Sequence, residues 1–132
     1  MEDCVFCKIV RGDVPSYKVY ESSTVLAFLD LSPLSEGHVL VIPKAHTEKL
    51  HGVSNDILQQ LIIAIKKIII ALGAENYNVL QNSGKLAKQE IPHVHFHVIP
   101  KTKFGGLDFY WVSEKDAEGL EELAAKLKKK IF

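Results

Sequence analysis

The chain has 132 residues, 47% of them apolar, and its 16 basic side chains equal its 16 acidic ones in number. This length and apolar fraction fit one globular domain with a substantial core. The zero net charge argues against general binding to nucleic acid or to anionic membranes, which a basic surplus usually accompanies, although it leaves room for a small local anion site.

The start of the chain and its most apolar stretch bear on where the protein works. Met1 is followed by the acidic residues Glu2 and Asp3, and no apolar signal-peptide segment follows them. The most apolar stretch is 57–72, but Lys66 and Lys67 interrupt it and it is short for a bilayer span. We therefore expect a cytoplasmic protein, with the nucleus as an additional location and no membrane partner.

The first half of the chain predicts a short helical turn, three strands and a long helix. The helical turn lies over 4–12, and the strands lie over 17–20, 24–31 and 38–43. The long helix begins after cap residues at 54–56 and ends before Gly73.

The second half predicts two more strands, over 77–81 and 93–99, which a polar loop over 82–89 connects. A C-terminal helix then has one apolar face, and Ser113 and Asp116 before it have capping-box spacing. The residues of this face are Leu120, Leu123, Ala124, Leu127 and Ile131. This order of elements predicts an α+β fold with a mainly antiparallel five-stranded sheet in a single domain, 1–132, whose core is 4–101 and whose tail is 102–132.

Histidines occupy alternate positions of segment 93–99, which reads His-Val-His-Phe-His-Val-Ile. Because successive strand side chains point to opposite faces, His93, His95 and His97 share one face and the apolar side chains share the other. Same-face neighbours lie about 6.6 Å apart, so a phosphoryl group fits between them. Imidazole can attack phosphorus, transfer a proton or bind a metal at neutral pH. A three-histidine metal site is the main alternative, but imidazoles of one strand reach a single ion poorly without a further ligand.

Four segments together with this pattern resemble the histidine-triad (HIT) family. The signature His-x-His-x-His followed by two apolar residues is present, and the similarity extends over segments 4–13 (CVFCKIVRGD), 27–33 (AFLDLSP), 37–46 (GHVLVIPKAH) and 78–99. The chain is most similar to the Hint branch, the nucleoside phosphoramidases, and it matches least beyond Lys101. The resemblance implies an enzyme that hydrolyses conjugates of purine nucleoside monophosphates, AMP or GMP, without an organic cofactor.

The resemblance implies a catalytic role for each histidine of the triad. The middle one, His95, would attack the α-phosphorus, displace the amine and form a nucleotidyl-histidine that water hydrolyses. Such a nucleophile needs a neutral ring with one nitrogen free and the other held by a hydrogen bond, which the family takes from a backbone carbonyl. His97 would contact a phosphate oxygen and support the leaving group, and His93 completes the catalytic group.

The resemblance also implies a nucleotide site. Asp30 would hold the ribose hydroxyls, because a carboxylate accepts both vicinal hydroxyl hydrogens; its local pattern alone favours a turn-forming aspartate. Core packing is the alternative for Phe28 and Leu31, and a simple turn is the alternative for Asn82. The full set of expected nucleotide contacts is Phe28, Asp30, Leu31, Asn82, Ser83, Gln89, His95 and His97.

One position departs from the family pattern. Several Hint proteins carry Ser or Thr directly after the glutamine that corresponds to Gln89, where this chain has Glu90. A hydroxyl can donate a hydrogen bond to the leaving group, whereas a carboxylate donates only when it is protonated. The leaving-group preference therefore stays open.

Two cysteines, Cys4 and Cys7, are spaced as a CxxC pair. A thioredoxin-like redox pair normally follows a strand, and no strand can precede residue 4; two unrelated buried thiols do not explain the spacing. Two thiolates and two histidines would make a closed tetrahedral zinc site. Some HIT proteins carry such a site, and the resemblance implies that His46 and His93 complete it as structural zinc ligands.

The long helix and the tail raise expectations about assembly. The helix is apolar around much of its circumference, and one sheet can cover only one stripe of it. Because similar HIT proteins pair symmetrically, we expect a two-fold homodimer. Aromatic side chains of the tail either anchor the last helix to the core or line a nucleotide pocket, including that of the second subunit; they are Phe104, Phe109, Tyr110 and Trp111.

Two further functions stay open from the sequence. The chain could be a hydrolase of dinucleoside polyphosphates, like another HIT branch, or a nucleotide-binding adaptor whose catalysis is incidental. A nucleotidyltransferase of the His-x-His-x-Gln type is less favoured, because His97 keeps the third histidine.

Overall fold

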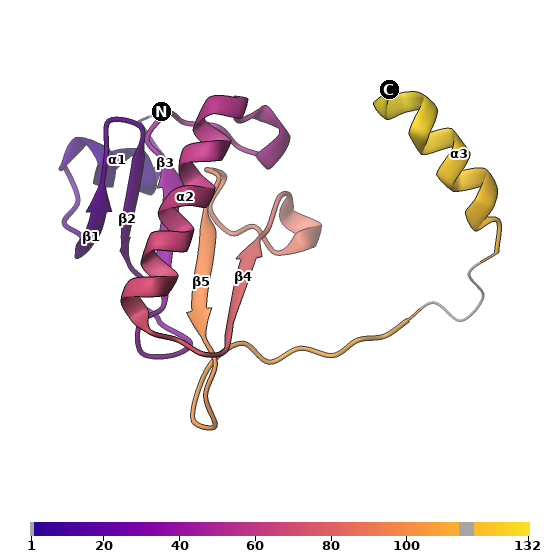
Figure 1. The fold of residues 1–132 in the computed structure, drawn as a ribbon. Helices are drawn as coiled ribbons and strands as arrows, with labels where there is room; N and C mark the ends of the chain where they lie inside the picture. The colour runs from indigo at the N-terminus through magenta and orange to yellow at the C-terminus, as the bar shows by residue number, and fades with distance from the viewer. Residues whose placement is uncertain (1, 114–117) are drawn as a thin grey trace.

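The computed structural model describes residues 2–113 and 118–132. Five strands form one antiparallel sheet in the order β1-β2-β3-β5-β4 (Figure 1). The strands are β1 (Lys18–Glu21), β2 (Val25–Leu29), β3 (Val39–Pro43), β4 (Tyr77–Gln81) and β5 (Phe96–Pro100). The sheet confirms the predicted α+β fold with its five antiparallel strands.

Two helices pack on opposite faces of the sheet. Helix α1 (Val5–Arg11) begins at Cys4, whose Sγ accepts a hydrogen bond from the Cys7 backbone N–H, and ends at Gly12 with φ of 84°. Helix α2 (Asn55–Leu72) begins at Ser54 and ends at Gly73, as the sequence predicted. Both helices end at a glycine in the left-handed conformation, which lacks the steric penalty of a Cβ.

The two helices divide the core into two clusters. The α2 side contains Val25, Ala27, Val39 and Val41, whereas the α1 side contains Leu26, Phe28, Leu40 and Ile42. Every residue of β3 is buried and so are four of the five in β2, because both faces of these central strands are covered. The alternation therefore sends even-numbered side chains of β2 and β3 toward α1.

The strand with the histidines is shorter than the sequence predicted. Strand β5 begins at Phe96, whereas the prediction began it at residue 93. The ladder ends there because β3 pairs only as far as Val41 opposite Phe96, and β4 ends at Gln81 opposite the same residue. The side chains still alternate: Val94, Phe96 and Val98 belong to the α2 cluster.

The C-terminal arm is the second departure. Helix α3 (Leu120–Ile131) has Gly119 as its N-cap, and no side chain in it is buried. It lies away from the sheet (Figure 1). Phe104, Tyr110 and Trp111 are 88–97% exposed, so these rings do not anchor the helix to the core. The capping-box residue Asp116 lies outside the described residues. Among the described residues, no helix is long and apolar enough to cross a membrane.

Candidate active site

A cavity of about 580 Å³ lies between α1 and the sheet and collects most of the expected site residues. Its walls come from α1, the end of β2, the start of β3 and the loop between β4 and β5. Phe28, Asp30, Leu31, Asn82, His95 and His97 line it. Apolar side chains also line it, among them Phe6, Ile9, Val14 and Phe28, and Phe6 contacts the His95 ring.

His95 has one nitrogen held and the other free. Its Nδ1 lies 2.7 Å from the carbonyl oxygen of His93, and since a carbonyl only accepts, Nδ1 must carry the proton. Nε2 then keeps its lone pair. The ring is 6% exposed and the edge-to-face contact with Phe6, at 5.1 Å between centroids, fixes its plane. This is the arrangement that a nucleophilic imidazole requires.

His97 is held in the opposite tautomer by His38. The Leu34 backbone N–H donates to His38 Nδ1 at 3.1 Å, so the His38 proton is on Nε2. That Nε2 lies 2.9 Å from His97 Nδ1, which must therefore accept. The proton of neutral His97 is then on its Nε2. The two catalytic candidates thus have opposite characters: His95 offers a lone pair and His97 offers an N–H.

Burial favours the neutral forms of His38 and His97. Burial lowers the pKa of His97 to about 4, with contributions from the nearby His95 and His38, while Asp30 opposes the shift. Burial also lowers the pKa of His38, again opposed by Asp30, whose Oδ2 lies 3.5 Å from His38 Nε2. At neutral pH the site therefore contains a neutral His97 that can donate without carrying a charge.

Asp30, His38 and His97 lie close enough together to suggest a metal site. The Leu34 N–H occupies Nδ1 of His38 and forces the proton onto Nε2, the atom that would have to face the ion. A protonated nitrogen cannot be a ligand. The hydrogen bonds therefore favour a chain of donors, in which Leu34 donates to His38 and His38 donates to His97, over a metal site.

The remaining expected nucleotide contacts divide into two groups. Asp30 follows the end of β2, and its Oδ1 accepts from the Ser32 N–H, which orients the carboxylate. Ser83 and Gln89 do not line the cavity. The Ser83 hydroxyl accepts a hydrogen bond from the Leu50 N–H. The Gln89 side chain accepts one from the Gly84 N–H and donates one to the Glu48 carbonyl. Both residues therefore stabilise the conformation of the loop.

A separate cluster brings Cys4, Cys7, His46 and His93 together, their ligand atoms within 4.8 Å of one another. Nε2 of His93 donates to the Pro43 carbonyl at 2.8 Å, which leaves the Nδ1 lone pair facing the two sulfurs. The His93 side chain is fully buried. Burial also raises the pKa of the Cys7 thiol, and the neighbouring Cys4 adds to this, so a nearby cation would favour the Cys7 thiolate. These four residues could hold a metal ion.

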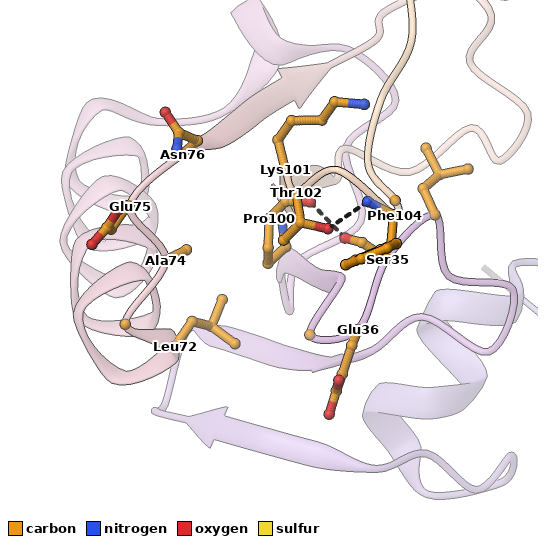
Figure 2. Close-up of a pocket in the computed structure, with 14 residues that line it drawn as sticks. Ser35, Glu36, Leu72, Ala74, Glu75, Asn76, Pro100, Lys101, Thr102 and Phe104 are labelled. Carbon is orange, nitrogen blue, oxygen red and sulfur yellow. Dashed lines mark hydrogen bonds between the residues drawn. The ribbon is translucent and has the colours of Figure 1, made fainter.

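A second hollow lies elsewhere in the described structure. It has a volume of about 910 Å³ and is formed where the end of α2 meets the end of β5, with Leu72, Pro100 and Phe104 among its walls (Figure 2). None of the described residues lining it is a histidine or a cysteine. It therefore offers no imidazole for attack on phosphorus.

Sequence reasoning assigned no role to His38, which the structure joins to His97. Its signal in the sequence is a polar residue directly before an all-apolar strand, since β3 is buried from Val39 to Pro43. Lys88, which also lines the cavity, was missed too. It has φ of 67°, the only positive value among the described non-glycine residues.

Comparisons with known proteins show the family of this chain. The HIT domain profile matches residues 11–104. An adenosine 5'-monophosphoramidase of Schizosaccharomyces pombe is 47% identical over 131 residues, covering 95% of this chain and 98% of the relative. A second, of Saccharomyces cerevisiae, is 43% identical and covers 97% of this chain and 82% of the relative. The crystal structure of a histidine triad nucleotide-binding protein from Candida albicans superimposes with a TM-score of 0.90 at 41% identity, covering 98% and 97% of the two chains. The chain belongs to the HIT family.

Proposed function

We propose that this protein hydrolyses phosphoramidates of purine nucleoside monophosphates through a nucleotide bound covalently to His95. The observation that carries the proposal is the hydrogen bond from His95 Nδ1 to the His93 carbonyl, which leaves Nε2 as a lone pair in a ring that lines the cavity. The names of the fungal relatives, adenosine 5'-monophosphoramidases, support the same activity.

The reaction proceeds in two displacements at phosphorus. His95 Nε2 attacks, a nitrogen–phosphorus bond to the ring forms, and the bond between phosphorus and the amine breaks. The His97 Nε2–H donates to the phosphate oxygen on which charge builds, and solvent at the cavity mouth supplies the proton with which the amine leaves. Water then attacks the same phosphorus, releasing the nucleoside monophosphate and the free ring of His95.

The nucleoside occupies the part of the cavity that Asp30 and apolar side chains line. Asp30 accepts the ribose hydroxyls, and Phe28 and Leu31 contact the purine. Asn82 also lines the cavity, where its amide can reach sugar or phosphate. Ser83 and Gln89 act by holding the loop that carries Asn82 and Glu90.

Zinc is the metal that the cysteine-histidine cluster fits. Tetrahedral zinc with Zn–S of 2.3 Å and Zn–N near 2.05 Å places sulfur and nitrogen about 3.5 Å apart. The Sγ–Nδ1 separations are 3.3 Å for Cys4 with His93, 3.3 Å for Cys7 with His46 and 3.6 Å for Cys7 with His93. Four protein ligands leave no open position, so the ion would be structural, tying α1 to the segment that supports His95.

A two-fold homodimer is the assembly we propose. Strand β4 is an edge of the sheet, and α2 lies over one face. Apolar side chains on both elements are at least 43% exposed, and they are Ile62, Ile63, Ile70, Tyr77 and Val79. Pairing of two β4 edges would cover them and join the sheets. The reduced thiols that zinc requires fit a cytoplasmic location.

Replacement of His95 by Ala tests the function. The variant should lose at least three orders of magnitude in kcat on an adenosine phosphoramidate, because the bond to the ring forms only along the reaction path, whereas AMP affinity should change little. His97→Ala should cost less, since it removes a donor and keeps the nucleophile. A quenched reaction of the unaltered protein should show one AMP added to the peptide that contains His95. An adduct on His97, or full activity in His95→Ala, would overturn the assignment, and faster turnover of diadenosine polyphosphates would change the substrate class.

A further inference from the structure

Ser16 lies in the loop between α1 and β1 and lines the cavity of the candidate active site. Its Oγ is shielded from solvent and has no hydrogen-bond partner. It is the only buried side-chain nitrogen or oxygen in this state among residues 2–113 and 118–132.

A buried hydroxyl without a partner destabilises a folded protein, because water bonded it in the unfolded chain and nothing replaces that bond. An alanine at this position would avoid the cost. An orphaned polar group that lines a binding cavity is accounted for when a ligand supplies the missing partner.

The sheet register places Ser16 beside the expected ribose site. Lys18 pairs with Phe28, and the Leu29 N–H donates to the Tyr17 carbonyl at 3.0 Å. Continuing this register by one residue sets Ser16 opposite Asp30, on the face that Phe28 shares. Side chains in such a pair have Cβ atoms about 5 Å apart.

The surroundings of Ser16 point to the base. It follows Val14 and Pro15, which line the same cavity as Phe6 and Phe28. The phosphate would lie beside His95 and the ribose beside Asp30, the residue opposite Ser16. A hydroxyl among apolar side chains next to the ribose site is placed to meet the heterocycle, whose ring nitrogens and exocyclic group are hydrogen-bonding partners.

We infer that Ser16 is a specificity-determining residue whose hydroxyl turns about χ1 and forms a hydrogen bond with the purine of the bound nucleotide. This inference rests on the proposed function, because it needs a nucleoside in this cavity. The hydroxyl can both donate and accept, so it can form a hydrogen bond with either purine. It therefore favours ligands that carry a base over ligands that lack one.

The test compares a ligand with a base and one without it. In Ser16→Ala, the Kd for AMP should rise roughly three- to tenfold, as expected for one neutral hydrogen bond. The Kd for ribose 5-phosphate, measured by calorimetry or by competition, should stay unchanged. The Tm of the unliganded variant should stay equal or rise, because the orphaned hydroxyl is gone.

Ser35→Ala is the matched control. The Ser35 hydroxyl donates to the Pro100 carbonyl at 2.7 Å and lines the other hollow, so its loss should lower Tm and leave both Kd values unchanged. An unchanged Kd for AMP in Ser16→Ala would overturn the inference, as would equal weakening of both ligands or a fall in Tm like that of Ser35→Ala. If the unaltered protein binds and hydrolyses the nucleotide and Ser16→Ala binds AMP with the same Kd, the inference about Ser16 fails and the proposed function stands. If the unaltered protein does not bind AMP, the proposed function fails first.

Discussion

The buried neutral His97 predicts a specific loss of stability in acid. Its pKa falls from an ordinary value of about 6.5 in the unfolded chain to about 4 in the folded protein. Below pH 6.5 the unfolded chain binds a proton at this residue that the folded protein does not bind until pH is near 4. The contribution of His97 to stability is therefore fully present above pH 6.5 and is lost as pH falls toward 4.

The size of the effect follows from the shift. A difference of 2.5 pKa units corresponds to about 3 kcal/mol, of which about 2 kcal/mol is already lost at pH 5. The perturbation is His97→Gln, which keeps an acceptor for His38 and removes the titrating group. Urea unfolding of both proteins at pH 7.5, 6 and 5 gives the free energy of unfolding, and the variant should lose about 2 kcal/mol less between pH 7.5 and 5.

Comparison with the unaltered protein removes the contribution of titrating groups remote from His97, such as the cysteine-histidine cluster, because both proteins contain them. His51→Gln, which removes an exposed imidazole, is the control and should follow the unaltered protein. Parallel pH profiles for His97→Gln and the unaltered protein would refute the reasoning, since His97 would then titrate alike in the folded and unfolded chains.

Three further predictions concern the metal, the assembly and the arm. Cys4→Ser should lose stoichiometric zinc and several degrees of Tm, measured by metal analysis and calorimetry of untagged protein; a metal-free unaltered protein, even after supplementation, would contradict the site. Val79→Lys should turn a sedimenting dimer into a monomer at micromolar concentration, because it puts a charge on the exposed β4 edge; an unaltered protein that is already monomeric would contradict the dimer. Trp111→Ala should leave Tm unchanged, because the ring is 88% exposed, and should alter the relative rates on different leaving groups; identical rate ratios would remove the arm from the site.

Local sequence signals predicted the boundaries of several helices and strands correctly. Helix α2 has a serine cap at its start and a glycine at its end, and both boundaries are where the sequence predicted them. Strand β4 also has its predicted bounds. Strand β2 is shorter than predicted because its pairing with β3 covers only Val25 to Leu29, and Asp30 follows it. A partner strand, which local residues do not encode, decides where a strand ends.

The sequence by itself predicted the fold class, because alternation and helix caps are local signals, and its resemblance to the HIT family indicated the family and the expected site residues. Only the tertiary structure decided which nitrogen of each histidine is free. The His93 carbonyl fixes His95, and His38, directly before β3, fixes His97. It also showed that helix α3, amphipathic in sequence, has no buried face within the described chain. The tautomer of His97 and the packing partners depend on contacts between residues far apart in sequence, and that of His95 depends on a backbone carbonyl two residues away; periodicity reveals neither kind of contact.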